Sequence, residues 1–377
     1  MLYRILSGFS PEDYYLVSRE AYIKNVEHAM YLPVEYFNIP GPRFLMHLNS
    51  QRIPQVLHEL ANIVVLIVWR TYKLVQIIHK HPVYAIIACT GDIADIPAGF
   101  LASKVLGVSF YAYIFDDYVY QWTGYYRSFA KFVARWIFKR ADGVIGPNEF
   151  ICEEYFQRYG VRYEIVHNPC NLEELNAPVY SLWPAEEGMV RIMYTGAIYR
   201  ANYDCFRNLI RAIDMLEDCN IELHIFTAQS MEELRAQGIA GEKVHVHSHI
   251  PYDQILEQQH RADILFLPLA FESPISEVIR TSAPGKMAEY LASGRPVLAH
   301  VPVDSFVAHY VNMKQCGAIA SQNDPSELAK CILKLISDED FRKLIIANAR
   351  KQAWLDFDPR VSGDRLNHFL DATMNQR

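Results

Sequence analysis

Pro284, Gly285, Lys286 and Glu289 have types and spacing that suit the binding of a phosphorylated ligand. Pro and Gly at the start of a helix leave free N–H groups at the positive end of the helix dipole, which favours a phosphate. A lysine in that first turn is unfavourable unless an anion is bound. Glu289 follows three residues later on the same side, where a carboxylate can take both hydroxyls of a ribose. The alternative is an ordinary surface helix.

The elements that must position this segment alternate along the chain. Short apolar runs alternate with amphipathic stretches, which predicts βα units with parallel sheets buried on both faces. Residues 171–188 are rich in Pro and acids and predict a linker. We therefore expect one domain over 1–170, a second over 189–355, and a C-terminal helix within 356–377 that crosses back to the first domain. Two such α/β domains leave a cleft at the carboxyl ends of their strands, where ligands bind.

The composition excludes several classes of protein. The chain has 377 residues with 51% apolar content, enough for a packed core, and a net charge of −7, which argues against a general nucleic-acid binder. Seven cysteines without a C-x-x-C pair argue against a disulfide framework and favour a reducing compartment. The longest apolar run, 61–69, is shorter than the ~20 residues that span a bilayer, so we expect no membrane-spanning helix.

The segment PGKMAEYLASGRPVLA at 284–299 resembles the donor-binding signature of GT-B glycosyltransferases of family 4, also called glycosyltransferase group 1. Four weaker passages occur in the family's order: ADGVIGPN at 141–148, VHNP at 166–169, MYTG at 193–196 and ADILFLP at 262–268. The resemblance implies the GT-B fold, with two Rossmann-like doubly wound domains facing a cleft. It also implies a retaining, metal-independent transfer of a sugar from a nucleotide-diphosphate sugar, which acts as co-substrate without a further cofactor.

The resemblance assigns roles to individual residues of the second domain. Glu289 would bind the ribose, and Lys286 with the backbone from Ser282 to Gly285 would face the diphosphate. Gly196 would allow the backbone to approach the diphosphate closely. The base would lie near Ile250, at the end of a strand expected over 244–250.

The acidic motif departs from the family pattern. The family usually has two glutamates eight residues apart, but the residue eight positions before Glu289 is Thr281. Glu272 is the first candidate for the displaced catalytic partner, with an enlarged loop after it, and Glu277 is the second. Which of the two replaces the usual glutamate, or whether neither does, stays open.

Two further departures concern the phosphate clamp and the N-terminus. The family's Arg and Lys after the first glycine of the second domain are replaced by Ala197 and Asn202, and we expect Arg200 to supply the charge. GT-B chains begin with a strand and a Gly-rich loop, whereas residues 1–10 resemble the tail of a helix that leads into a strand at 14–18. One interpretation is that the first βα unit, with part of the acceptor site, is missing.

Asp116 and Asp117 follow a buried strand expected over 109–115. The family often has a His or Asp after this strand, close to the reacting sugar. Asp116 is therefore the first candidate for a contact to the sugar or acceptor, and its carboxylate could receive the acceptor proton; Asp117 is the second. The alternative is that the pair caps the following turn.

A helix expected over 127–140 carries a basic stripe without an acid. Its members recur every four residues: Arg127, Lys131, Arg135 and Lys139. The opposite face is expected to hold Phe132, Val133, Trp136 and Ile137. Because like charges at this spacing repel, the stripe suggests an anionic partner, such as phospholipid headgroups or a polyprenyl-phosphate acceptor. The alternative is a solvated face.

His245, His247 and His249 alternate, so they point to one side of a strand and could bind a metal. No carboxylate or cysteine joins them at ligand spacing, and we expect no metal.

The leading prediction is a cytoplasmic glycosyltransferase, peripheral on the inner face of the cell membrane, that acts on a saccharide or lipid-linked acceptor and binds no nucleic acid. Its product would be part of a bacterial surface polysaccharide or glycolipid. Two alternatives remain: a degenerate GT-B protein that binds donor or scaffolds a partner, and a nucleotide-sugar epimerase of the same architecture, which would need acid and base groups from both domains.

Overall fold

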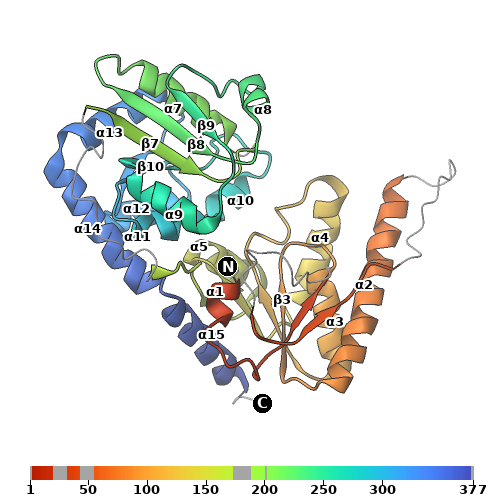
Figure 1. Ribbon diagram of the computed structural model, residues 1–377. Helices are drawn as coiled ribbons and strands as arrows, with labels where there is room; N and C mark the ends of the chain where they lie inside the picture. The colour runs from red at the N-terminus through yellow and green to blue at the C-terminus, as the bar shows by residue number, and fades with distance from the viewer. Residues whose placement is uncertain (1, 20–31, 43–54, 173–187, 200–201, 375–377) are drawn as a thin grey trace. The chain divides into compact units, whose positions relative to one another are not determined.

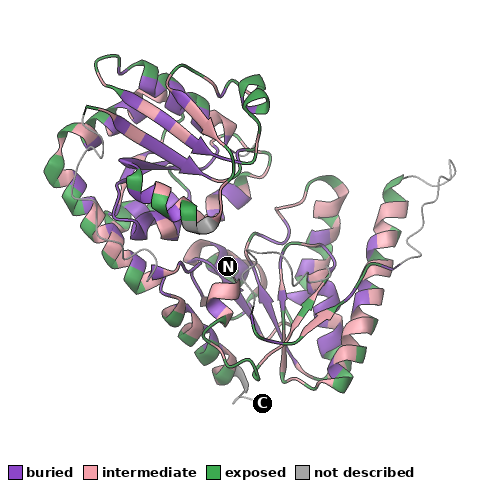
Figure 2. Ribbon diagram, viewed as in Figure 1, coloured by how far each residue is buried: buried purple, intermediate pink, exposed green. Residues whose placement is uncertain are grey.

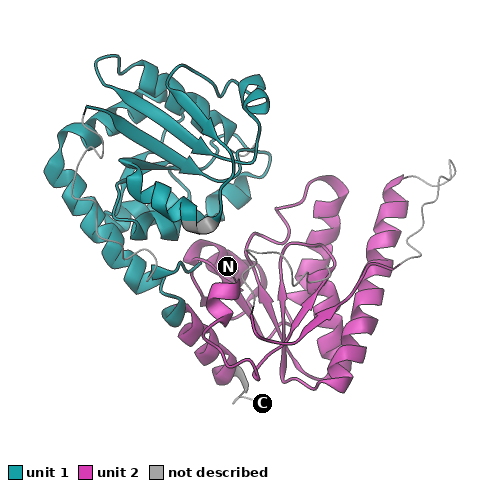
Figure 3. Ribbon diagram, viewed as in Figure 1, with its two compact units in different colours: residues 1, 168–361 teal, residues 2–167, 362–377 magenta. Residues whose placement is uncertain are grey.

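The computed structural model describes residues 2–19, 32–42, 55–172, 188–199 and 202–374. The chain forms two compact units (Figure 3): an N-terminal unit of residues 2–167 and 362–377, and a C-terminal unit of residues 168–361. The expected linker at 171–188 lies almost wholly outside the described residues.

The C-terminal unit is built on one parallel sheet in the order β12-β11-β10-β7-β8-β9 (Figure 1). Its strands are β7 (Val190–Thr195), β8 (Ile221–Phe226), β9 (Val244–His247), β10 (Ile264–Pro268), β11 (Val297–His300) and β12 (Ala318–Ala320). This is the strand order of a Rossmann fold, with the topological switch between β7 and β10. β10 and β11 are buried along their whole length, as near-continuous apolar runs in a covered parallel sheet should be.

Helices of the C-terminal unit follow the strands in alternation. They are α7 (Tyr203–Asp214), α8 (Met231–Ala236), α9 (Tyr252–Arg261), α10 (Ser276–Thr281), α11 (Gly285–Ala292), α12 (Phe306–Lys314), α13 (Pro325–Ser337) and α14 (Glu339–Asp356). Residues at alternate positions of β7 and β8 pack with α7 and α13 in the main core of this unit. α10 was not expected, because its six residues lie where the sequence indicated only a loop.

The N-terminal unit has a parallel sheet of four strands in the order β3-β4-β5-β6. The strands are β3 (Ala85–Cys89), β4 (Ser109–Tyr113), β5 (Gly143–Gly146) and β6 (Tyr163–Ile165). A separate parallel pair is formed by β1 (Leu16–Ser18) and β2 (Tyr36–Asn38). The strands of both larger sheets are mostly buried (Figure 2). The expected α/β class with Rossmann-like parallel sheets is confirmed.

Helices cover both faces of the N-terminal sheet. One face packs against α2 (Gln55–Lys80), α3 (Asp95–Leu106), α4 (Gly124–Ile137) and α5 (Glu149–Tyr159). The other face packs against α1 (Leu2–Leu6) and α15 (Pro359–Met374). The C-terminal helix α15 is thus part of the sheet packing of the N-terminal unit: the Phe369 ring meets Tyr111 edge-on, with centroids 5.8 Å apart.

α2 is long and apolar enough to cross a membrane by length and composition, with a mean hydropathy of 1.4 in its most apolar stretch. The expectation of no membrane-spanning helix considered only the apolar run 61–69. Few charged residues flank that run, so α2 as a whole has the length and apolar composition of a membrane-spanning helix. Within the unit, Ile63 and Ile67 are buried in the core, and Arg70 pairs with Asp95 at 2.8 Å.

The docking of α15 requires a glycine at position 143 in β5. A Cβ at Gly143 would stand 2.5 Å from the Phe369 ring, which is itself held in the core. We predict that Gly143→Ala lowers the free energy of unfolding by about 1–3 kcal/mol, because overpacking displaces α15. Thermal unfolding measures the loss. The control is Gly8→Ala, whose added Cβ meets only the Ile5 carbonyl oxygen at 3.9 Å; equal melting temperatures for the two variants would contradict this packing.

Candidate functional site

α11 is fixed against the carboxyl end of β7, next to the topological switch of the C-terminal sheet. The backbone N–H of Thr195, the last residue of β7, donates a hydrogen bond to the Tyr290 hydroxyl of α11 over 3.1 Å. The loop that leads into α11 is held as well, because the Asn168 side-chain amide donates to the Ala283 carbonyl over 2.8 Å. The N-terminus of α11 is therefore positioned where ligands of Rossmann folds bind.

Lys286, in the first turn of α11, lies against the end of β7. Its ammonium group is 3.8 Å from the centroid of the Tyr194 ring. Gly196 has φ of +128°, and a Cβ there would stand 2.8 Å from Lys286 Nζ. Only glycine provides both this backbone conformation and the room for the lysine. The structure thus brings together Gly196 and Lys286, two residues that the sequence assigned to donor binding.

The electrostatics of this corner suit an anionic ligand. Burial lowers the pKa of Lys286 to about 7, and the Glu289 carboxylate offsets part of this effect. Among the described residues no side chain caps α11, whose N-cap is Pro284, and Gly285 is exposed with open space around it. An arriving diphosphate would find open backbone N–H groups and a lysine whose charge it would stabilise.

Of the other four residues predicted to contact the donor, three are half-buried and one is outside the described residues. Glu289 and Ser282 are half-buried, the first one turn into α11 and the second at the C-terminal end of α10. Ile250 is half-buried in the loop after β9, which ends at His247 and not at residue 250 as expected. Arg200 lies outside the described residues.

The acidic loop before α11 is shaped by a residue that the sequence analysis missed. Asp204, in the first turn of α7, accepts hydrogen bonds from the backbone N–H groups of Phe271 at 2.8 Å and Glu272 at 3.1 Å. The Glu272 side chain is exposed, and Glu277 is half-buried in the first turn of α10. The Asp204–Phe271 contact joins residues 67 positions apart, so no local sequence pattern indicates it.

Thr281, which occupies the position of the family's first glutamate, is 2% exposed. Its hydroxyl donates to the Glu277 carbonyl over 3.2 Å within α10. This position therefore holds a buried helix contact in place of an acid.

In the N-terminal unit, the two aspartates after β4 have different surroundings. Asp116 has an exposed surface, but the protein around its carboxyl group removes part of its hydration, and this desolvation together with the neighbouring Asp117 raises the pKa of that group. Asp117 is 1% exposed; it accepts from the backbone N–H of Val119 at 2.8 Å and pairs with Arg158 at 2.8 Å. Asp117 thus caps the turn, the alternative reading, and its assignment to the acceptor is corrected because the side chain is enclosed.

The four basic residues of the predicted stripe on α4 have different surroundings. Arg127 is tied to the loop before the helix, because its guanidinium donates to the Trp122 carbonyl over 2.6 Å. Lys131 and Arg135 are exposed, and Lys139 is exposed just beyond the end of α4. Phe132 and Trp136 were expected on the face opposite the stripe, but both are exposed.

Phe132 is 79% exposed and Trp136 is 45% exposed, beside the basic residues. The small residues Ala130 and Ala134, with Ile137, make the buried face of α4, because only small side chains fit between this helix and its neighbours.

The N-terminal unit also contains a cavity of about 1450 Å³. It lies against β3 and includes Thr90 and Gly91 at the carboxyl end of that strand, with Arg70 and Asp95 in its wall. Its size exceeds that of a monosaccharide, and its wall is both apolar and charged.

Comparison with known proteins connects this site to a family. Residues 190–338 match the family described as glycosyl transferases group 1. A glycosyltransferase from Rickettsia africae ESF-5 has a similar structure, with a TM-score of 0.66 at 14% identity over 91% of this chain and 86% of that chain. Sucrose-phosphate synthase from Thermosynechococcus elongatus gives a TM-score of 0.65 at 14% identity over 96% and 89%.

HepE of Anabaena, in complex with UDP, gives a TM-score of 0.65 at 16% identity over 98% of this chain and 95% of that chain. No curated protein matches the sequence. At these identities the structural likeness shows the fold, while the family match covers the part of the C-terminal unit that includes α11. The chain therefore has the GT-B fold, and its residues 190–338 are similar to the family described as glycosyl transferases group 1.

Proposed function

We propose that this protein is a glycosyltransferase that transfers a hexose from a nucleotide-diphosphate sugar to a saccharide or lipid-linked acceptor, with retention of configuration and without a metal ion. The observation that carries the proposal is the contact of Lys286 with Tyr194 and Gly196 at the open N-terminus of α11. The complex of Anabaena HepE with UDP-glucose supports UDP as the first donor nucleotide to test.

Each residue has a defined part in the proposed transfer. The backbone N–H groups at the start of α11 and Lys286 bind the diphosphate, and they stabilise the charge that grows on it as the sugar leaves. Gly196 lets the β7 backbone approach the diphosphate, and Glu289 accepts hydrogen bonds from the ribose hydroxyls. Asp116 contacts the sugar or acceptor, and its raised pKa suits a group that accepts the acceptor's proton.

A donor-binding protein without transfer activity is the second candidate, and the buried Thr281 in place of an acid favours it. Turnover of the donor sugar distinguishes the two candidate functions. A transferase hydrolyses or transfers the sugar of its donor in the presence of acceptor, whereas a degenerate protein binds the donor without turnover.

The ribose role of Glu289 predicts a loss of nucleotide affinity. Glu289→Ala removes an acceptor of two hydrogen bonds, each worth about 1.5–3 kcal/mol when the group is charged, so the UDP dissociation constant should rise at least tenfold. Isothermal titration calorimetry measures it. Glu339→Ala, on the exposed surface of α14, is the matched control and should bind UDP as the parent does. Equal affinities of the two variants would remove Glu289 from the site.

The pKa of Lys286 predicts proton uptake on nucleotide binding. With a pKa of about 7, Lys286 is mostly neutral at pH 8, and a bound diphosphate raises this pKa, so the complex gains a proton. We expect an uptake of about one proton per site at pH 8 and almost none at pH 6, where Lys286 is already charged. Calorimetric titrations with UDP in buffers of different ionisation enthalpy give the number of protons taken up per site.

Lys286→Met is the control for this uptake, because it keeps the length of the side chain and lacks the titrating group. It should bind UDP more weakly and take up no proton at pH 8. Uptake of the same size in Lys286→Met would mean that another group titrates, and the phosphate role of Lys286 would fail.

We also propose that the protein acts in the cytoplasm, bound to the inner face of the cell membrane, in the synthesis of a surface polysaccharide or glycolipid. The support is a patch on the N-terminal unit, here named the α4 patch: Lys131, Phe132, Arg135, Trp136 and Lys139. Exposed aromatic and basic side chains side by side suit anionic lipid headgroups. α2 adds an exposed apolar row that includes Leu57, Val64 and Val68.

The α4 patch predicts binding to anionic vesicles. Each exposed basic residue near such a surface contributes about 1 kcal/mol, so replacing Lys131, Arg135 and Lys139 by Gln should weaken binding on the order of 100-fold. Sedimentation with phosphatidylserine vesicles measures it, and phosphatidylcholine vesicles should bind neither protein. The matched control replaces Lys330, Lys343 and Lys351 of the C-terminal unit by Gln. A parent that stays in the supernatant would end the proposal.

A further inference from the structure

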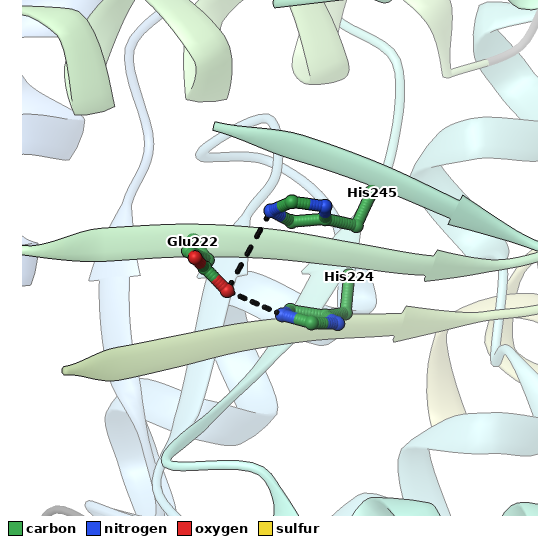
Figure 4. Close-up of side chains that lie close together, drawn as sticks. All are labelled: Glu222, His224 and His245. Atoms are coloured by element: carbon green, nitrogen blue, oxygen red, sulfur yellow. Dashed lines mark hydrogen bonds and ion pairs between the residues drawn. The ribbon is translucent and has the colours of Figure 1, made fainter. Parts of the chain in front are cut away.

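Three ligand-type side chains converge on one face of the C-terminal sheet, at the β8–β9 edge (Figure 4). β8 and β9 pair in parallel with His224 opposite His245, and Glu222 stands two residues before His224 on the same face. Glu222 Oε2 is 3.0 Å from His224 Nε2 and 3.5 Å from His245 Nε2. The three donor atoms all lie within 4.8 Å of one another.

These separations match those of a zinc site. Zn–N and Zn–O bonds of about 2.0–2.2 Å at tetrahedral angles place two ligand atoms roughly 3.3–3.5 Å apart. The two carboxylate–imidazole distances, 3.0 and 3.5 Å, bracket that value. Two imidazoles and one carboxylate are also a known donor set for zinc with an open fourth position.

A third histidine supplies the outer contact that metal-bound imidazoles commonly have. His247 Nε2 is 3.0 Å from His224 Nδ1, on the side of the ring opposite to Glu222. When His224 donates its Nδ1–H to His247, its Nε2 lone pair points at the Glu222 carboxylate, and a cation between them removes the repulsion.

A cavity adjoins one member of the cluster, His224. This cavity of about 300 Å³ is lined by His224 and His247 together with Arg191, Phe226 and Arg261. It has room for a water or a small anion as a fourth ligand. The His245 side chain is 41% exposed and can adjust toward an arriving ion.

We propose that Glu222, His224 and His245 bind a divalent transition-metal ion, zinc first, at the β8–β9 edge. The site lies on strands away from α11 and uses none of the residues assigned to the donor, so it does not take part in sugar transfer. Its ion ties β9, the last strand in the sheet order, to β8 and stabilises the C-terminal unit by binding only the folded state.

The test uses the full chain after dialysis against EDTA. Addition of Zn²⁺ should raise the melting temperature, and Co²⁺, used as the spectroscopic probe, should give the visible absorption bands of tetrahedral coordination. Glu222→Gln, His224→Asn and His245→Ala should each weaken Co²⁺ binding at least tenfold, because each removes a direct ligand. His247→Ala should weaken it less than these, because it only orients His224.

His249→Ala is the matched control, since this histidine is exposed beyond the end of β9 and outside the cluster. It should bind Co²⁺ as the parent does. UDP affinity and circular dichroism, measured for every variant, verify that each is folded. A parent that binds no Zn²⁺, or equal Co²⁺ affinities for His245→Ala and His249→Ala, would overturn the proposal and leave the cluster as a hydrogen-bonded network.

Discussion

The contact between Lys286 and the end of β7 is the constraint on which the candidate site depends. A cation placed over the Tyr194 ring, next to a glycine that leaves it room, is partly removed from water, and its pKa falls to about 7. This position is unfavourable for a lysine at the start of a helix without an anion nearby. The Tyr290–Thr195 hydrogen bond holds α11 in that position, so the fold keeps the Lys286 ammonium group at the open N-terminus of the helix.

Much of the C-terminal unit could be predicted from the sequence because its signals are local. The start of α11 could be predicted, since Pro284 and Gly285 mark it. Apolar runs likewise predicted β10 and β11. Contacts between distant segments gave no such signal. Asp204 binds the backbone of a loop 67 residues away, and no local pattern indicates this.

Strand pairing explains the main gap in the site prediction. Alternation showed that His245 and His247 share a face, but the carboxylate beside them comes from β8, and only the register of β8 with β9 brings Glu222 near. The α4 helix shows the opposite error. Its large apolar residues were expected to share the face opposite the basic stripe. The small residues Ala130 and Ala134 form the buried face instead, and Phe132 is exposed.

The packing of α15 on the N-terminal sheet has a consequence for how the protein is made. The N-terminal unit is discontinuous, since residues 168–361 separate its two parts, and Ser362 at the start of the second part bonds to the His167 carbonyl at the end of the first over 3.2 Å. During synthesis residues 168–361 are made before the second part of the N-terminal unit, because chains are made from their N-terminus. The N-terminal unit, whose first part is made first, therefore completes its packing only after the residues of the C-terminal unit have been added.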